Sequence, residues 1–228
     1  MRLLVSPSSI EEARSALAAD IIDVKKPSEG SLGANFPWVI RAIKEMAEKP
    51  VSAAIGDFDY KPGSAALAAY GAACAGADYI KVGLMFDGKE KAYELSKAVV
   101  KAIKDEFPEK IVVIAAYSDY QRLGTISPFI AAEAAADAGA DVAMIDTGRK
   151  DGKSTFAFMD ADALAAFTEK NRSLGVATAL AGSLKFEDLT LLKTIDPEII
   201  GVRGMVCGGD RADAIRPELV DQALAMIR

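Results

Sequence analysis

The feature that most constrains the fold of this chain is a short apolar run followed by a longer helical stretch, repeated eight times. The runs lack the alternation of a half-exposed strand, so they predict parallel strands that are buried on both faces. Glycine precedes several runs, as in the segments AGAD, DAGAD and SLGV, where it ends the preceding helix. Eight such units in 228 residues favour one α/β fold, a single (β/α)8 or TIM barrel, over an open doubly wound sheet.

The expected barrel fills the whole chain as one domain, residues 1–228, because no linker or low-complexity segment interrupts the pattern. Strands are expected at 3–5, 21–24, 51–55 and 78–84, in KIVVIAAY up to Tyr117, in ADVAMID up to Asp146, and at 176–180 and 199–202. Among the helices, one is expected over 89–107, one opening at Gly182 and Ser183, and the last over 217–227. The chain has neither a GxGxxG fingerprint nor a Walker loop, which argues against a dinucleotide-binding or P-loop domain.

The overall charge bears on the partners of the protein. A net charge of −6 gives no general attraction for nucleic acid or for an anionic membrane, so local groups must hold any anionic substrate. Cys74 and Cys207 form no CxxC motif and are expected to be reduced thiols. No apolar stretch approaches the roughly 20 residues that cross a bilayer. These features predict a cytoplasmic protein without nucleic-acid or membrane partners.

The chain contains no histidine, and this limits its chemistry. Histidine is the usual general base and the commonest zinc ligand, so a His-dependent triad is excluded and a catalytic metal is not expected. Acid–base work must fall to Lys, Asp, Glu, Tyr or water. A lysine can do this work near neutral pH only if burial or a nearby cation lowers its pKa from about 10.4.

Charged residues gather where the even-numbered strands are expected to end. Asp23 and Lys25 follow one another on the same face of the second strand, and Lys81 lies within the apolar fourth strand. Asp146 ends the sixth strand, and Lys150 follows four residues later. Alternate strands of such barrels share inward layers, and active sites lie at the carboxyl ends of the strands. We therefore expect these five side chains to meet in one site.

Two interpretations of this cluster compete. A ring of ion pairs that caps the barrel core would also place charges there. Clustered lysines, however, destabilise one another's charge, which lowers a lysine pKa and leaves a neutral amine able to attack a carbonyl and form a Schiff base. An aspartate can then relay protons. We take Lys25, Lys81, Asp146 and Lys150 as candidate catalytic residues, with Lys25 first, and Asp23 as a substrate-binding residue.

A phosphate-binding signal follows the last two strands, where barrels of this kind usually place it. Gly182 and Ser183 come after the seventh strand, and Arg203 and Gly204 come after the eighth. Glycines let the backbone approach a phosphate, helix N–H groups bind its oxygens, and an arginine can add bidentate contacts. A second glycine-rich stretch, 208–211, follows. Together these segments predict a site for a phosphorylated substrate.

Several nearby residues receive no definite role from the sequence. The loop over 29–35 is either a lid over the site or a surface turn. Asp57 is either an acid–base group or a helix cap, and Tyr117 is a candidate lining residue. The sequence also leaves open whether the protein forms a homo-oligomer.

The segments DIIDVKKPSEGSLGANFPWVI, ADYIKVGL, DVAMIDTGRKDGK, ALAGSLK and GVRG resemble the (5-formylfuran-3-yl)methyl phosphate synthase family, also called 4-(hydroxymethyl)-2-furancarboxaldehyde-phosphate synthase. The resemblance covers essentially the whole chain, and SEGSLGANFPWVI is its most specific part. It implies a cofactor-free barrel lyase of the carbon–oxygen type acting on phosphates, in methanofuran biosynthesis. Such an enzyme condenses two molecules of glyceraldehyde 3-phosphate into a phosphorylated furan aldehyde, with loss of phosphate and water.

The resemblance also implies residue roles. The Schiff-base lysine of the family matches Lys25, its further active-site lysines match Lys81 and Lys150, and its aspartate matches Asp146. The chain departs from the family at Lys26, where Asn or a similar residue usually follows the reactive lysine. This adds a second cation beside Lys25. The alternation of side chains along the strand favours Lys25 over Lys26 as the reactive lysine.

Two other functions fit the same residues. One is a class I aldolase-like enzyme or a Lys/Asp sugar-phosphate lyase or isomerase, in which charged groups need only stabilise an enediolate. The other is a non-catalytic barrel that binds a sugar phosphate, because fold alone does not establish catalysis.

Overall fold

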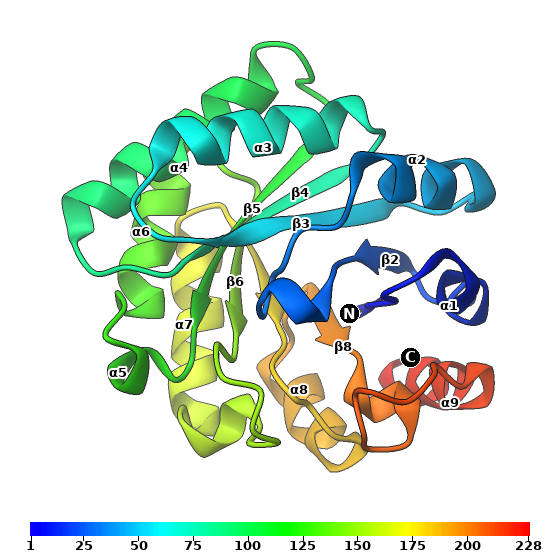
Figure 1. Cartoon of the computed structure of the whole chain (residues 1–228). Helices are drawn as coiled ribbons and strands as arrows, with labels where there is room; N and C mark the ends of the chain where they lie inside the picture. Colours follow the sequence, from blue (N-terminus) through cyan, green and yellow to red (C-terminus); the bar gives the residue numbers. More distant parts are fainter.

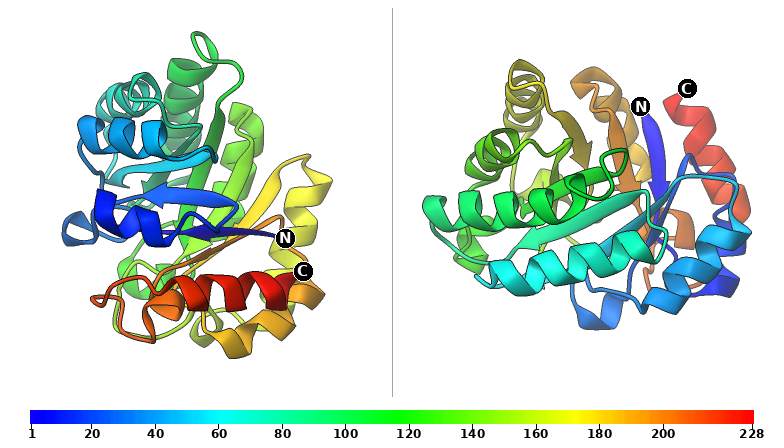
Figure 2. Two further views of the ribbon diagram at one scale, coloured as in Figure 1. Left: turned by 90° about the vertical axis from the view of Figure 1, so that its right-hand side faces the viewer. Right: turned by 90° about the horizontal axis from the view of Figure 1, so that it is seen from above.

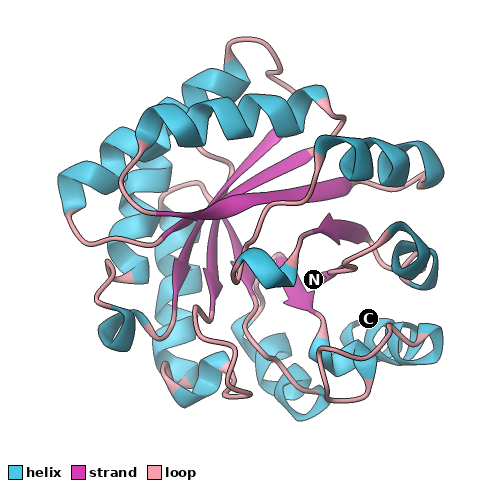
Figure 3. Cartoon of the chain, viewed as in Figure 1, coloured by secondary structure: helices cyan, strands magenta, loops and turns pink.

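The structure, a computed structural model, describes all residues 1–228 and confirms the predicted single (β/α)8 barrel. Eight parallel strands close in sequence order, with β1 paired to β8 (Figures 1 and 3). The strands are β1 (Arg2–Val5), β2 (Ile21–Val24), β3 (Val51–Phe58), β4 (Tyr79–Leu84), β5 (Ile111–Tyr117), β6 (Val142–Asp146), β7 (Ala177–Leu180) and β8 (Ile199–Val202).

Helices surround the barrel, and the two chain ends lie side by side in every view (Figures 1 and 2). The α-helices are α1 (Ile10–Ser15), α2 (Pro37–Met46), α3 (Pro62–Cys74), α4 (Lys89–Lys104), α5 (Tyr120–Leu123), α6 (Pro128–Ala138), α7 (Ala161–Ser173), α8 (Leu189–Ile195) and α9 (Pro217–Ile227). Short 3-10 turns are η1 (Pro27–Glu29), η2 (Thr155–Ala157), η3 (Phe186–Asp188) and η4 (Gly204–Cys207). Proline at the first position begins α2, α3, α6 and α9, where its missing N–H costs nothing. No helix is both long and apolar enough to span a membrane.

The barrel interior has an apolar lower part and a charged upper part. The side chains of Ile21 on β2, Tyr79 on β4 and Met144 on β6 belong to a small buried cluster inside the barrel, separate from the larger cluster between strands and helices. Two residues further along β2 and β4 stand the inward residues Asp23 and Lys81. The inward-facing side chains of β2 and β4 are therefore apolar in the lower part of the barrel and charged in the layer above it.

The region after β7 differs from the sequence prediction. The helix expected to open at Gly182 and Ser183 does not begin there, because both residues have positive φ angles, +101° and +50°. The chain then runs extended to Lys185, and α8 begins only at Leu189. The largest boundary differences are three residues: β3 extends to Phe58 instead of 55, and α4 ends at Lys104 instead of 107.

Candidate active site

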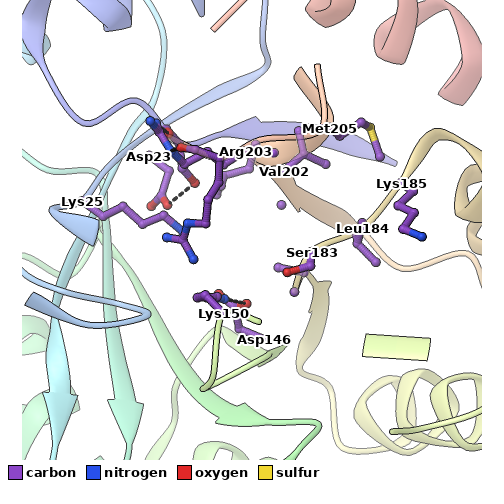
Figure 4. A pocket seen from close by; sticks show the side chains of 18 of the residues that line it. Asp23, Lys25, Asp146, Lys150, Ser183, Leu184, Lys185, Val202, Arg203 and Met205 are labelled. Carbon is purple, nitrogen blue, oxygen red and sulfur yellow. Dashed lines mark hydrogen bonds and ion pairs between the residues drawn. The ribbon is translucent and has the colours of Figure 1, made fainter. Parts of the chain in front are cut away.

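A cavity of about 720 Å³ opens at the carboxyl ends of the strands. Figure 4 shows Lys25, the Asp146–Lys150 pair, Ser183 and Arg203 around this common space. All nine residues that the sequence singled out for catalysis or binding line it: Asp23, Lys25, Lys81, Asp146, Lys150, Gly182, Ser183, Arg203 and Gly204. The structure thus brings together groups that lie up to 181 residues apart in the chain.

Lys25 carries an unpaired, buried amine. It follows β2 directly, is 6% exposed, and its Nζ atom makes no hydrogen bond or ion pair. Burial lowers the pKa of Lys25 from 10.5 to about 8; Asp146 opposes this shift, and Lys150 adds to it. An amine with this pKa is partly neutral near pH 7 and can act as a nucleophile.

Lys81 and Asp23 form a fully buried ion pair. The Nζ atom of Lys81 lies 2.9 Å from both carboxylate oxygens of Asp23. The hydroxyl groups of Ser6 and Ser52 donate to the same carboxylate at 2.8 and 2.7 Å. Burial would raise the pKa of Asp23, but the charges of Lys81 and Lys25 hold it below its usual value. Asp23 thus remains an anion whose oxygens are occupied by protein donors.

Asp146 and Lys150 form a second pair at the cavity wall. Lys150 Nζ lies 2.5 Å from Asp146 Oδ1, and the backbone N–H of Thr147 donates to that oxygen at 2.7 Å. Asp146 Oδ2 accepts no hydrogen bond within the chain, so it is available to a bound substrate. Burial acts to raise the pKa of Asp146, but Lys150 and then Lys25 oppose it, and the net shift is downward.

The turn after β7 contains three consecutive backbone N–H groups without a partner, in residues that line the cavity. The N–H groups of Gly182, Ser183 and Leu184 have no hydrogen-bond partner within the chain, and all three residues line the cavity. Only glycine fits at 182, because a Cβ there would lie 2.3 Å from Thr155 Oγ1 and 2.8 Å from the backbone nitrogen of Thr147. Neighbouring free N–H groups of this kind bind anions. The turn, rather than a helix start, supplies these donors.

Arg203 lines the cavity, but the protein itself uses most of its guanidinium. Its Nε donates to the carbonyl of Arg211 at 2.8 Å, and Nη1 donates to the carbonyl of Ser6 at 2.7 Å. Nη1 and Nη2 also bind the carboxylate of Glu12 at 2.9 and 3.1 Å. Of the five N–H groups of an arginine, these contacts leave one. The bidentate phosphate contact expected of Arg203 therefore has no pair of free donors.

Lys26 lies outside the cavity. Its Nζ pairs with Glu29 at 2.7 Å and lies 4.5 Å from the centre of the Phe36 ring. Lys26, the other candidate for the reactive lysine, is therefore paired with Glu29 outside the cavity, whereas Lys25 lines it.

The loop after Lys25 is tied to the barrel rim. Ser31 Oγ donates to the carbonyl of Thr147 at 2.8 Å, and the N–H of Leu32 donates to the carboxylate of Asp57. Tyr117 Oη also donates to Asp57. Asp57 thus holds the loop in place, and neither Asp57 nor Tyr117 lines the cavity.

Comparison with known proteins identifies relatives over the full chain. The family model described as 4-HFC-P synthase matches residues 3–224. A (5-formylfuran-3-yl)methyl phosphate synthase of Methanosarcina mazei is 59% identical over 99% of this chain and 98% of its own length. The synthase of the same name from Methanocaldococcus jannaschii is 54% identical over 97% of each chain.

Solved structures share the fold at low sequence identity. A 3-hexulose-6-phosphate synthase superposes with a TM-score of 0.70 at 24% identity over 100% of both chains. KGPDC from Streptococcus mutans gives a TM-score of 0.70 at 16% identity over 99% of this chain and 96% of that one. These likenesses concern the barrel architecture alone.

Proposed function

Because the chain belongs to the 4-HFC-P synthase family, we propose that it condenses two molecules of glyceraldehyde 3-phosphate into (5-formylfuran-3-yl)methyl phosphate. The atoms balance when one inorganic phosphate and two molecules of water are released. The observation that carries the proposal is the buried, unpaired amine of Lys25 beside a lysine–aspartate pair.

Lys25 is the nucleophile of the proposed reaction. Its neutral Nζ attacks the carbonyl carbon of one triose phosphate, a C–N bond forms, and loss of water gives an imine. The protonated imine draws electrons from the adjacent carbon, so that a proton can leave it. Loss of this proton is followed by loss of the phosphate from C3 of the bound triose, which leaves an enol with a terminal CH2 carbon. This carbon forms a bond to the carbonyl carbon of the second triose phosphate, which has isomerised to the ketone. The C1 hydroxyl group of the second triose then closes the ring on C2 of the first, two molecules of water are eliminated, and hydrolysis of the imine frees Lys25.

Asp146 and Lys150 move the protons. The free Oδ2 of Asp146 can accept a proton from the carbon next to the imine, and Lys150 can donate one to a departing oxygen. Lys81 is held by Asp23 and has no free role as a nucleophile; its charge helps to lower the pKa of Lys25. Gly182, Ser183 and Gly204 border the space expected for one substrate phosphate.

Two measurements on the intact protein test this function. Incubation with glyceraldehyde 3-phosphate should produce the ultraviolet absorbance of a furan aldehyde together with free phosphate. Borohydride added during turnover should leave a reduced triose adduct on Lys25, located by peptide mass spectrometry. Lys25→Arg should abolish both signals, and Lys26→Arg is the matched control that should keep them.

The outcomes separate the alternatives. Furan formation without an adduct on Lys25 would favour chemistry without an imine. Absence of both products would favour a barrel that only binds a sugar phosphate.

A further inference from the structure

The cations around the cavity are paired within the protein, with two exceptions. Seven lysine and arginine residues line it: Lys25, Lys81, Lys150, Lys185, Arg203, Arg211 and Arg216. Five of them form ion pairs: Lys81 with Asp23, Lys150 with Asp146, Lys185 with Glu187, Arg203 with Glu12, and Arg216 with Glu218. Lys25 and Arg211 have no carboxylate partner. Since an arginine stays protonated, Arg211 is the one permanently charged side chain of the cavity wall that lacks a counterion.

A hydrogen bond holds the backbone carbonyl of Arg211, whereas its guanidinium makes no hydrogen bond or ion pair within the chain. The residue lies in the segment between η4 and α9, and its carbonyl accepts the 2.8 Å hydrogen bond from Arg203 Nε. Arg203 is itself held by Glu12 at the start of α1. Gly204 lies against the segment, since a Cβ there would lie 3.7 Å from the Cβ of Arg211. The fold thus anchors Arg211 through Arg203 and leaves its guanidinium free.

The surroundings of this guanidinium are suited to an anion. Arg211 is half-buried, and burial lowers its pKa, whereas Asp146 raises it. The Asp146 carboxylate already binds Lys150, so it does not neutralise Arg211. The strands β7 and β8 are hydrogen-bonded neighbours, so the three free N–H groups after β7 and Arg211 after β8 border the same side of the cavity. A half-buried cation and unused N–H donors that line the same cavity can both bind one phosphate, which stabilises the bound state.

We propose that Arg211, and not Arg203, is the arginine that binds a substrate phosphate, together with the N–H groups of Gly182, Ser183 and Leu184. Arg203 is a positioning residue, which holds the Arg211 segment against Gly204. This inference rests on the proposed function for the identity of the substrate. The phosphate site itself does not depend on that reaction.

Binding of inorganic phosphate, measured by isothermal titration calorimetry, tests the site without any turnover. Arg211→Gln should weaken binding roughly tenfold or more, because it removes charge-assisted hydrogen bonds. The matched control is Arg41→Gln on α2, which removes the same charge from an exposed residue outside the cavity and should leave the affinity unchanged. Arg211→Lys, which keeps the charge but not the fork of donors, should give an intermediate affinity.

Trapping of the imine supplies a second readout. With unphosphorylated glyceraldehyde, Arg211→Gln should form the reduced Lys25 adduct as well as the unmodified protein does, which also shows that the variant is folded. With glyceraldehyde 3-phosphate, the substrate concentration for half-maximal trapping should rise. Unchanged phosphate affinity in Arg211→Gln, or no phosphate binding by the unmodified protein at millimolar concentration, would overturn the proposal. Absence of any adduct in the unmodified protein would contradict the imine mechanism but leave the calorimetric result on Arg211 intact.

Discussion

Lys81 Nζ lies 2.9 Å from both carboxylate oxygens of Asp23, and this pairing leaves Lys25, two residues beyond Asp23, without a carboxylate of its own. The two lysines therefore differ although both are buried. Lys81 is paired with a carboxylate, whereas Lys25 has a lowered pKa and no partner. This asymmetry within one cluster is what distinguishes a reactive amine from a structural ion pair.

The first expectation concerns the pH dependence of imine formation. Only the neutral amine of Lys25 reacts, and with a pKa of about 8 roughly a tenth of it is neutral at pH 7. The initial rate of borohydride trapping should therefore rise with pH, reach half its maximum near pH 8, and level off above it. A midpoint near 10.5, the ordinary value for lysine, would show that the amine is not perturbed.

Asp146→Asn and Lys150→Met should move this midpoint in opposite directions. Asp146 raises the pKa of Lys25, so its loss, which also leaves the charge of Lys150 uncompensated, should shift the midpoint to lower pH. Lys150 lowers the pKa of Lys25, so its loss should shift the midpoint to higher pH. The measurement is the same trapping profile for each variant. Shifts in the same direction would mean that Coulomb interactions do not set the reactivity of Lys25.

Asp23→Asn should destabilise the fold strongly. The change leaves the Lys81 ammonium buried without a counterion, which costs about 3–5 kcal/mol in the free energy of unfolding. Ser52→Ala, which removes one hydrogen bond to the same carboxylate, should cost only about 1 kcal/mol. Urea unfolding at pH 7 compares the two variants. Equally small losses would show that the buried pair contributes little to stability.

Gly182→Ala should impair both stability and substrate binding. Its Cβ would meet Thr155 Oγ1 and the backbone of Thr147, and the positive φ angle adds strain, so we expect a loss of about 2–4 kcal/mol. Gly175→Ala is the matched control: its φ angle is also positive, at +73°, but no atom lies within 4 Å of the new Cβ. It should lose about 1 kcal/mol and keep the KM for triose phosphate. Thermal unfolding and steady-state kinetics give the two readouts.

The barrel and its charged layer could be predicted from the sequence because both follow from local patterns. Continuous apolar runs predict buried parallel strands, and the two-residue alternation places Asp23 and Lys25 on one face. The pairing of Lys81 with Asp23 joins residues 58 positions apart, so no local pattern reveals it.

The phosphate side of the site was less accessible to sequence reasoning. Arg203 resembles a free phosphate ligand until its partner Glu12, 191 residues away in the chain, is seen beside it. The serine-led segment after β7 resembles a helix start, but contacts with Thr147 and Thr155 favour a left-handed turn. The GGDR stretch indicated a glycine-rich loop, and only the ion pairs of the folded chain show that its arginine is unpaired.

The packed apolar residues below the charged layer close the barrel interior, so the cavity opens at the carboxyl ends of the strands alone. In the proposed reaction, both reactants must enter through this opening, and the furan, the phosphate and the water must leave through it. The order of product release therefore affects the turnover rate, because a phosphate that is still bound in the cavity blocks the entry of the next reactant. Inorganic phosphate should consequently act as a competitive product inhibitor.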